Sequence, residues 1–227
     1  MRAAFFDVDE TVITVKSMFE FLRHWLDDET SYAATMNRVH AMAEGGVHRT
    51  EINRFYYRQF TGVPAAEVRA AGADWYQRYR RGPNAFHVAT LRALADHRTR
   101  GDLVVLVTGS FRPILGPLMA DIGADEALCS DPVIDVDGRY TGEVPIPMIG
   151  DNKTAAVAAR IASLGLDPAN CSAYGDHHTD LGMLSLVGDP VAVGSDPVLA
   201  AEATTHGWRT LPGTTGPLSA GLLSTVD

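Results

Sequence analysis

Three acidic residues crowd into four positions near the start of the chain, directly after an apolar run. They are Asp7, Asp9 and Glu10 in the stretch "AAFFDVDETVIT". Carboxylates held this close repel one another unless a bound cation or a proton offsets their negative charge. Hard oxygen ligands of this kind are those that Mg²⁺ prefers. The spacing therefore predicts a divalent-cation site. Because Asp7 and Asp9 alternate along the chain, they need not do the same work.

A second acidic group has the same arrangement later in the chain. In "CSAYGDHHTDLGML" a short apolar run ends at Gly175, and Asp176 and Asp180 follow it. In an open α/β sheet, ligands bind beyond the carboxyl ends of the strands, so acids that follow two strands point into one crevice. We therefore expect the two acidic groups to close on one metal ion.

The elements that must position these acids are short strands. Apolar runs of strand length, with the continuous character of buried parallel strands, occur at residues 3–8, 103–108, 171–174 and 191–193. Helix-like stretches such as 152–164 lie between them. This alternation predicts an α/β fold with a parallel sheet and right-handed crossovers. The segment 133–144 alternates apolar and polar residues around Asp137-Gly138, which predicts a β-hairpin.

The region 15–100 has a different pattern. Its apolar residues recur at helical spacing, which predicts a bundle of amphipathic helices inserted into the α/β body. We expect its aromatic side chains to form core. The insert carries 13 Lys and Arg against 9 Asp and Glu, although the whole chain has a net charge of −9. The net charge argues against nucleic acid as the main partner. The basic insert is explained by scattered surface arginines, which the charge counts alone favour, or by an anionic ligand at the insert and a cation at the body.

Length and composition set the frame. A chain of 227 residues can bury a real core and fits one domain that carries an insertion. The two cysteines, Cys129 and Cys171, match no paired metal spacing and are expected to be small core residues in a reducing compartment. The sequence has neither the apolar stretch of a signal peptide nor the ~18 uninterrupted apolar residues of a membrane span. We therefore expect a cytoplasmic protein with no membrane partner.

Four motifs together resemble the haloacid dehalogenase (HAD) superfamily of phosphatases. In the family's order they are "DVDET", "VLVTGS", the lysine of "GDNKTAAV", and "GDHHTD". The resemblance covers nearly the whole chain, because a helical insert between the first two motifs is what the family calls a C1 cap. It is nearest to the phosphoserine-phosphatase-like branch, subfamily IB. It implies a Rossmann-like core at residues 1–14 and 101–227 and a helical-bundle C1 cap at 15–100, which would close as a lid over the substrate.

The resemblance also implies roles for the motif residues. Asp7 would be the nucleophile that forms an aspartyl-phosphate, and Asp9 the general acid and base. Mg²⁺ would be held by the Asp7 side chain, the Asp9 backbone carbonyl and Asp176. The phosphoryl oxygens would be held by Thr108, the Gly109 amide and Lys153. Asp180 would orient Lys153 or a metal-bound water, and Thr11 would support the nucleophile loop.

Lys16 departs from the phosphoserine phosphatases, which carry a glutamate at about this place to meet the substrate's amino group. Only Lys16 and Lys153 among the nineteen basic residues are lysines. Because a cation repels an ammonium group, we expect a small phosphate ester with a further anionic or polyhydroxy part, such as a sugar phosphate, polyol phosphate or phospho-acid; phosphoserine is the alternative. The cap residues expected to contact it are Glu20, Arg49, Arg54 and Arg58.

Two alternatives stay open in the sequence. Imidazoles at His177 and His178, beside a divalent site, suit a softer ion such as Mn²⁺, Co²⁺ or Zn²⁺; alternatively, one supports the site by hydrogen bonding and the other faces solvent. The second alternative is that the chain is not an enzyme but a non-catalytic phospho-ligand-binding or regulatory module. The intact set of acids favours turnover, because a storage module has no use for an acid and base two residues past the acceptor. The oligomeric state is open.

Overall fold

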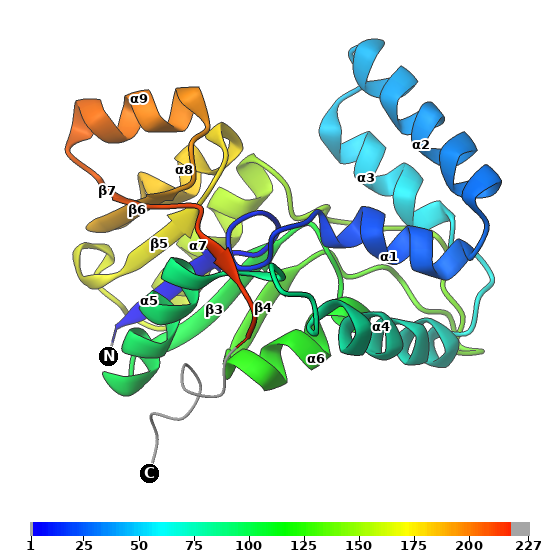
Figure 1. Cartoon of the computed structure of the whole chain (residues 1–227), viewed down its shortest axis with the longest axis horizontal. Coiled ribbons are helices and arrows are strands. Elements are labelled where there is room, and N and C mark those ends of the chain that lie inside the picture. Colours follow the sequence, from blue (N-terminus) through cyan, green and yellow to red (C-terminus); the bar gives the residue numbers. More distant parts are fainter. Residues whose placement is uncertain (1, 219–227) are drawn as a thin grey trace.

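A six-stranded sheet forms the centre of the computed structural model, which describes residues 2–218 (Figure 1). The spatial order is β4-β3-β1-β5-β6-β7, and every neighbouring pair is parallel. The strands are β1 (Ala3–Asp7), β3 (Leu103–Thr108), β4 (Glu126–Cys129), β5 (Ser172–Gly175), β6 (Asp189–Val193) and β7 (Arg209–Leu211). The predicted α/β fold with a parallel sheet is confirmed. The sequence patterns did not predict β4 and β7.

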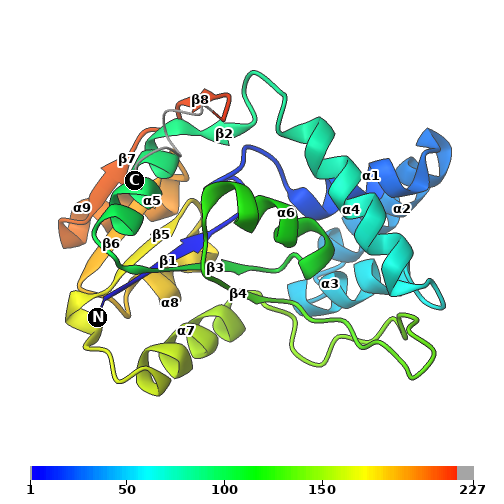
Figure 2. The ribbon, with the colours of Figure 1, turned by 90° about the horizontal axis from the view of Figure 1, so that it is seen from below.

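Helices cover both faces of this sheet, because successive side chains of a buried strand point to opposite sides. Phe6 belongs to one core cluster and its neighbour Phe5 to the other. Helices α5 (Val88–Thr99) and α6 (Arg112–Ile122) cover the Phe6 face and lie in front of β1 and β3 in Figure 2. The Phe5 face is covered by α7 (Asp151–Ser163), α8 (Leu181–Leu184) and α9 (Pro197–His206).

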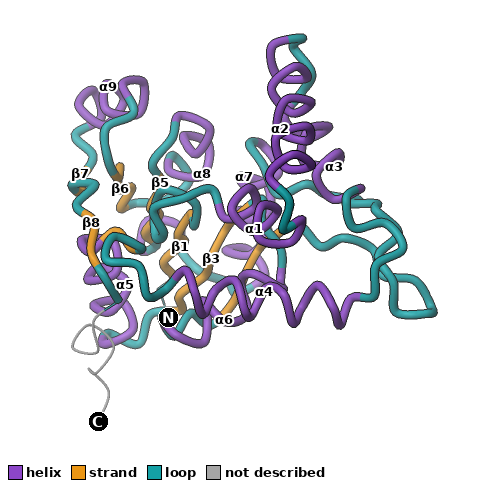
Figure 3. Tube along the Cα trace, turned by 45° about the vertical axis from the view of Figure 1, so that its right-hand side comes forward, coloured by secondary structure: helices purple, strands orange, loops and turns teal. Residues whose placement is uncertain are grey.

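Four further helices are inserted between β1 and β3, as the helical spacing predicts. They are α1 (Ser17–Leu26), α2 (Glu29–Glu44), α3 (Arg49–Arg58) and α4 (Ala65–Tyr79). Figures 1 and 3 show α2 and α3 projecting away from the sheet. Helix α2 has one buried residue, Val39, and the Asp28 side chain caps its start by accepting hydrogen bonds from the Thr30 and Ser31 amides.

The inserted helices share a core with the sheet. The ring of Phe111, at the start of α6, lies within 6.3 Å of the rings of Phe21, Tyr56, Tyr57 and Phe60, measured between centroids. Helices α4 and α6 also approach closely at Gly72, where an added Cβ would lie 2.3 Å from the Pro113 carbonyl oxygen. The expected aromatic core of the insert is therefore continuous with the α/β core.

Helix α5 lies within the range 15–100 expected for the cap, but it packs on the sheet. Its residues Leu91 and Leu94 join the same core cluster as Val104 and Leu106 of β3. Just before it, β2 (Phe86–His87) pairs with β8 (Thr215–Gly216) in a small antiparallel sheet. Helix α5 thus packs as part of the α/β body, although the helical pattern of the sequence places it with the insert. The expected boundaries at residues 14 and 100 stay a prediction, and Met1 and residues 219–227 of the expected core lie outside the described residues.

The predicted hairpin at 133–144 is confirmed by antiparallel backbone hydrogen bonds. The Val133 amide donates to the Glu143 carbonyl at 2.9 Å, and the turn has Gly138 at φ 75°. The hairpin also contacts the insert, since the Tyr140 amide donates to the Val63 carbonyl at 2.9 Å. The hairpin therefore adds to the interface between the inserted helices and the α/β body.

Two other expectations concern the core and the surface. Cys129 and Cys171 are both free thiols and both buried, as predicted. Within residues 2–218, no helix combines the length and the apolar character that a membrane crossing requires.

Candidate active site

The two acidic groups meet at the carboxyl edge of the sheet. Strand β1 lies between β3 and β5, so Asp7 at its end is flanked by the loops that follow Thr108 and Gly175. Carboxyl ends of neighbouring parallel strands share one edge, which explains why residues far apart in sequence converge here.

Lys153 bridges two buried carboxylates. It lies in the first turns of α7, and its Nζ is 2.5 Å from Asp7 Oδ1 and 2.8 Å from Asp180 Oδ1. All three side chains are buried. Burial by itself lowers the pKa of Lys153, but the carboxylates of Asp180 and Asp7 outweigh it and raise that pKa above its usual value. Lys153 is therefore a fixed positive charge beside the Asp7 carboxylate.

Asp7, Asp176 and Asp180 form an oxygen cluster. One carboxylate oxygen of each lies within 4.8 Å of the others. The Thr11 hydroxyl lies 2.8 Å from Asp176 Oδ1 and 3.4 Å from Asp7 Oδ2, so it links two members. Burial raises the pKa of Asp7, which Lys153 opposes, and burial raises the pKa of Asp176 to about 6. Three crowded carboxylates, with the pKa values of Asp7 and Asp176 raised, fit a hard divalent cation, whose positive charge would offset their mutual repulsion.

Asp9 has an environment of its own. Its Oδ1 accepts a hydrogen bond from the Ser17 amide at 3.0 Å. Burial raises its pKa to about 7, with the Asp7 carboxylate adding to the rise and Ser17 opposing it. A carboxyl group that titrates near neutrality suits proton transfer in both directions. Sequence reasoning missed Ser17, whose hydroxyl also lies 3.0 Å from that of Ser110.

The loop after β3 is held by side chains of the insert. Within it, the Ser110 amide donates to the Thr108 hydroxyl at 3.0 Å. The Gly109 carbonyl accepts hydrogen bonds from the Tyr57 hydroxyl at 2.7 Å and from Asn53 Nδ2 at 3.2 Å. Sequence reasoning missed both donors. The available signal was Asn53, an amide on the helical face that carries the apolar stripe of α3.

Another tyrosine of α3 has a different position. Tyr56 is buried, and its hydroxyl has no hydrogen-bond partner among the described residues. Burial raises its pKa, and the Asp9 carboxylate adds to this rise. A buried hydroxyl that has no partner among residues 2–218 is suited to a polar group of a bound ligand.

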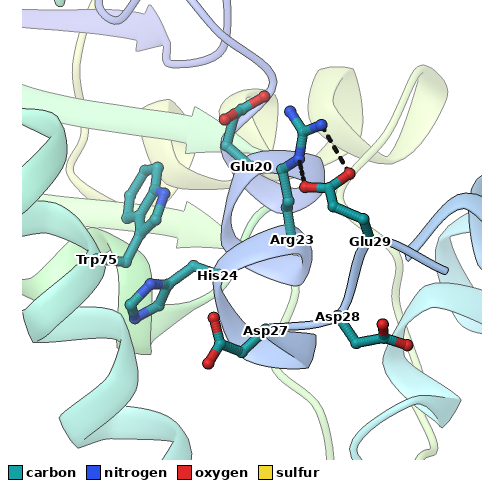
Figure 4. Close-up of a pocket in the computed structure, with 7 residues that line it drawn as sticks. All are labelled: Glu20, Arg23, His24, Asp27, Asp28, Glu29 and Trp75. Atoms are coloured by element: carbon teal, nitrogen blue, oxygen red, sulfur yellow. Dashed lines mark hydrogen bonds and ion pairs between the residues drawn. The ribbon is translucent and has the colours of Figure 1, made fainter. Parts of the chain in front are cut away.

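The candidate cap residues lie in different surroundings. Lys16 is exposed and forms an ion pair of 3.5 Å with Glu10. Glu20 lines a groove of about 320 Å³ between α1, the start of α2 and α4 (Figure 4). Figure 4 shows this groove bordered by the Arg23–Glu29 ion pair and Trp75. The groove is lined by Glu20, Arg23, His24, Asp27, Asp28, Glu29 and Trp75, and so is separate from the oxygen cluster.

The three arginines of α3 differ as well. Arg54 pairs with Glu51 and donates to the Val144 carbonyl at 3.2 Å, so its guanidinium holds the segment before α7. Arg58 is exposed at the end of the helix. Arg49 is exposed at the start, and its charge helps lower the pKa of His177, after burial and the neighbouring His178. Arg49 thus has an electrostatic link to the loop that carries Asp176 and His177.

Comparisons with known proteins agree with this geometry. A family model described as haloacid dehalogenase-like hydrolase matches residues 4–185. The "inhibition of morphological differentiation protein" of Streptomyces azureus is 32% identical over 237 residues, covering 92% of this chain and 77% of that protein. A phosphoserine phosphatase of Mycobacterium tuberculosis is 28% identical over 220 residues, covering 91% of this chain and 69% of that protein. A solved structure of a protein of unknown function from Bordetella pertussis has a TM-score of 0.83 at 23% identity, covering 94% of this chain and 99% of that chain. The chain therefore belongs to the haloacid dehalogenase-like hydrolases, in their phosphatase group.

Proposed function

We propose that this enzyme is a Mg²⁺-dependent phosphomonoester hydrolase that works through an aspartyl-phosphate on Asp7. The observation that carries the proposal is the pairing of buried Asp7 with Lys153, next to Asp176 and two residues before Asp9. This reaction needs a carboxylate nucleophile, which Asp7 would supply, and a positive charge that binds the phosphoryl oxygens, which Lys153 would supply. It also needs an acid with a pKa near neutrality, which Asp9 would supply.

In the first step an Asp7 carboxylate oxygen attacks phosphorus, and the bond from phosphorus to the alcohol oxygen breaks. Asp9, protonated below its pKa of about 7, gives its proton to the leaving alcohol. In the second step Asp9 takes a proton from water, the water oxygen attacks phosphorus, and inorganic phosphate leaves as the Asp7 carboxylate is restored. Lys153 and the Thr108-Gly109 loop bind the phosphoryl oxygens throughout.

The metal ligands in this proposal are Asp7, Asp176 and the Asp9 backbone carbonyl, with Asp180 close enough to take part. When bound, Mg²⁺ would neutralise the repulsion between the phosphate and the Asp7 carboxylate. Oxygen donors alone also accept Mn²⁺, and Co²⁺ is a further candidate.

For the substrate we propose a small phosphate ester with a polyhydroxy or anionic part. Lys16 and the buried Tyr56 hydroxyl support this, since neither offers the carboxylate that a substrate ammonium would need. However, Glu10 pairs with Lys16 and weakens the repulsion of an ammonium group. Phosphoserine therefore stays the alternative, and a relative carries that activity in its name. We place the enzyme in the cytoplasm, where its two buried thiols would stay reduced.

The test is phosphate release from a panel of sugar phosphates, polyol phosphates, phospho-acids and phosphoserine with Mg²⁺. The variant Asp7→Asn should abolish release while the protein stays folded, and Asp137→Asn, in the exposed hairpin turn, should not. Preferred turnover of phosphoserine would reject the substrate class but not the reaction. No release from any ester with Mg²⁺, Mn²⁺ or Co²⁺ would favour a phospho-ligand-binding module instead.

A further inference from the structure

A second candidate metal cluster lies beside the oxygen cluster and has different donor chemistry. It consists of His177, His178 and Asp196, whose ligand atoms lie within 4.8 Å of one another. The histidines follow β5, and Asp196 follows β6 at the start of α9. Because β5 and β6 are parallel neighbours, the loops after them share one edge of the sheet, which brings these residues together.

The two oxygens of the Asp196 carboxylate face different groups. Its Oδ1 accepts a hydrogen bond from the Leu199 amide at 2.8 Å and thereby caps α9. Its Oδ2 faces His178 Nδ1 at 3.7 Å, which is too long for a hydrogen bond. Two ligands of one tetrahedral zinc ion, each about 2.1 Å from it, lie about 3.4 Å apart. The observed separation is thus closer to that of two ligands of one ion than to a hydrogen bond.

His177 completes the set. Its ring lies 3.9 Å from the His178 ring between centroids. Its Nδ1 is 3.0 Å from the Thr179 hydroxyl oxygen. The Thr179 amide also donates to this Nδ1 at 3.3 Å, so two contacts hold the His177 ring in place. Hydrogen bonds that fix the ring orientation are the usual support of a metal-binding histidine.

We propose that His177, His178 and Asp196 bind a borderline transition-metal ion such as Zn²⁺ or Co²⁺, at a site separate from the oxygen cluster. Two imidazoles and a carboxylate suit these ions, whereas Mg²⁺ prefers oxygen ligands only. Three protein ligands leave a fourth position for water or another small ligand. Because His177 directly follows Asp176, the chain holds the two clusters in adjacent residues of one loop.

The test is a titration of the full chain with Co²⁺ in excess Mg²⁺, followed by visible absorption and by equilibrium dialysis. We expect one Co²⁺ per chain, displaced by Zn²⁺. His178→Ala and Asp196→Asn should each weaken binding at least tenfold, and asparagine at 196 retains an oxygen that can cap α9. His206→Ala, which removes an exposed histidine of α9, should bind as the wild type does.

The variant Asp176→Asn separates the two clusters. Since Asp176 belongs to the oxygen cluster, Co²⁺ binding in excess Mg²⁺ should persist in this variant. Loss of binding in Asp176→Asn together with normal binding in His178→Ala would assign the ion to the oxygen cluster and overturn the proposal. Absence of Co²⁺ and Zn²⁺ binding by the wild type would overturn it as well. These readouts do not depend on phosphatase activity.

Discussion

The Tyr57 hydroxyl donates a hydrogen bond of 2.7 Å to the Gly109 carbonyl, and so joins a helix of the insert to the loop proposed to bind phosphate. Asn53, one turn earlier on α3, donates to the same carbonyl. The Tyr57 ring also packs on Phe111, 5.2 Å away between centroids. Any movement of α3 away from the sheet would break these contacts, so the position of α3 and the shape of this loop are linked.

The variant Tyr57→Phe tests this link. It removes one hydrogen bond to a partly buried carbonyl that Asn53 still contacts, so the free energy of unfolding should fall by about 1 kcal/mol. We expect kcat/KM for a phosphate ester to fall several-fold, because the Gly109 amide is less well fixed. Urea unfolding and steady-state phosphate release measure the two effects. Tyr32→Phe, on the exposed helix α2, is the matched control; equal effects in both variants would argue against the link.

Asp9→Asn tests the acid and base role. Alkyl phosphates release a poor leaving group that needs a proton, so their hydrolysis should fall by about 10²- to 10⁴-fold. Formation of the phospho-enzyme from 4-nitrophenyl phosphate should fall much less, because nitrophenolate leaves without a proton. Rapid-quench measurement of the first turnover distinguishes the two substrates. An equal loss with both would remove the acid role from Asp9.

The pKa of Asp9 also predicts a pH dependence. This pKa is raised to about 7, so the carboxyl holds its proton below that pH and loses it above. The first chemical step, which needs the protonated form, should therefore slow as the pH rises above about 7 with alkyl phosphates. Single-turnover rates between pH 5.5 and pH 8.5 measure this. A first-turnover rate that rises with pH over this range would contradict the assignment.

Lys153→Met tests the buried ion pairs. The change leaves Asp7 and Asp180 without their shared cation, and breaking a buried pair in this way costs about 3–5 kcal/mol of unfolding free energy. Lys16, the other lysine of the chain, is exposed, so Lys16→Met should change stability by less than about 0.5 kcal/mol. Urea unfolding of both variants without Mg²⁺ gives the comparison. Similar losses of unfolding free energy in the two variants would show that the ion pairs of Lys153 with Asp7 and Asp180 contribute no more to stability than an exposed lysine does.

His97 predicts a pH dependence of stability outside the candidate site. It is buried between Asp102, 2.8 Å from its Nδ1, and the Tyr174 hydroxyl, 2.9 Å from its Nε2. Burial lowers its pKa, and the nearby Asp102 carboxylate only partly opposes this. Below about pH 6.5 the unfolded chain binds a proton at this residue that the folded chain does not, so stability falls as the pH falls through that range.

Urea unfolding of the wild type and His97→Gln between pH 5 and pH 8 isolates this contribution. The difference in unfolding free energy between them should shrink as the pH falls below about 6.5. Only the wild type has a histidine at 97 that binds a proton more tightly in the unfolded chain than in the folded one. His40→Gln, on the exposed face of α2, serves as the control. A difference that grows toward low pH would show that folded His97 binds the proton more tightly than the unfolded chain does.

The sequence by itself determined the α/β body, the helical character of the insert and the family. Short stretches of sequence encode these features, because buried strands are continuous apolar runs and helices have a period of 3.6 residues. The order of acids after strand ends then predicted that Asp7 and Asp176 converge, because the carboxyl ends of parallel strands share an edge. The structure places both in the oxygen cluster.

Only the tertiary structure decided which residues far apart in the chain meet. Helical periodicity put α5 with the insert, but packing placed it on the sheet. Nor could the sequence pattern show that Tyr57 contacts Gly109 or that Arg54 binds the segment before α7. The approach of Asp196 to His178 was equally absent from the pattern. The physical reason is that a local pattern states which face of an element is buried, whereas the partner of that face is set by how the elements pack together.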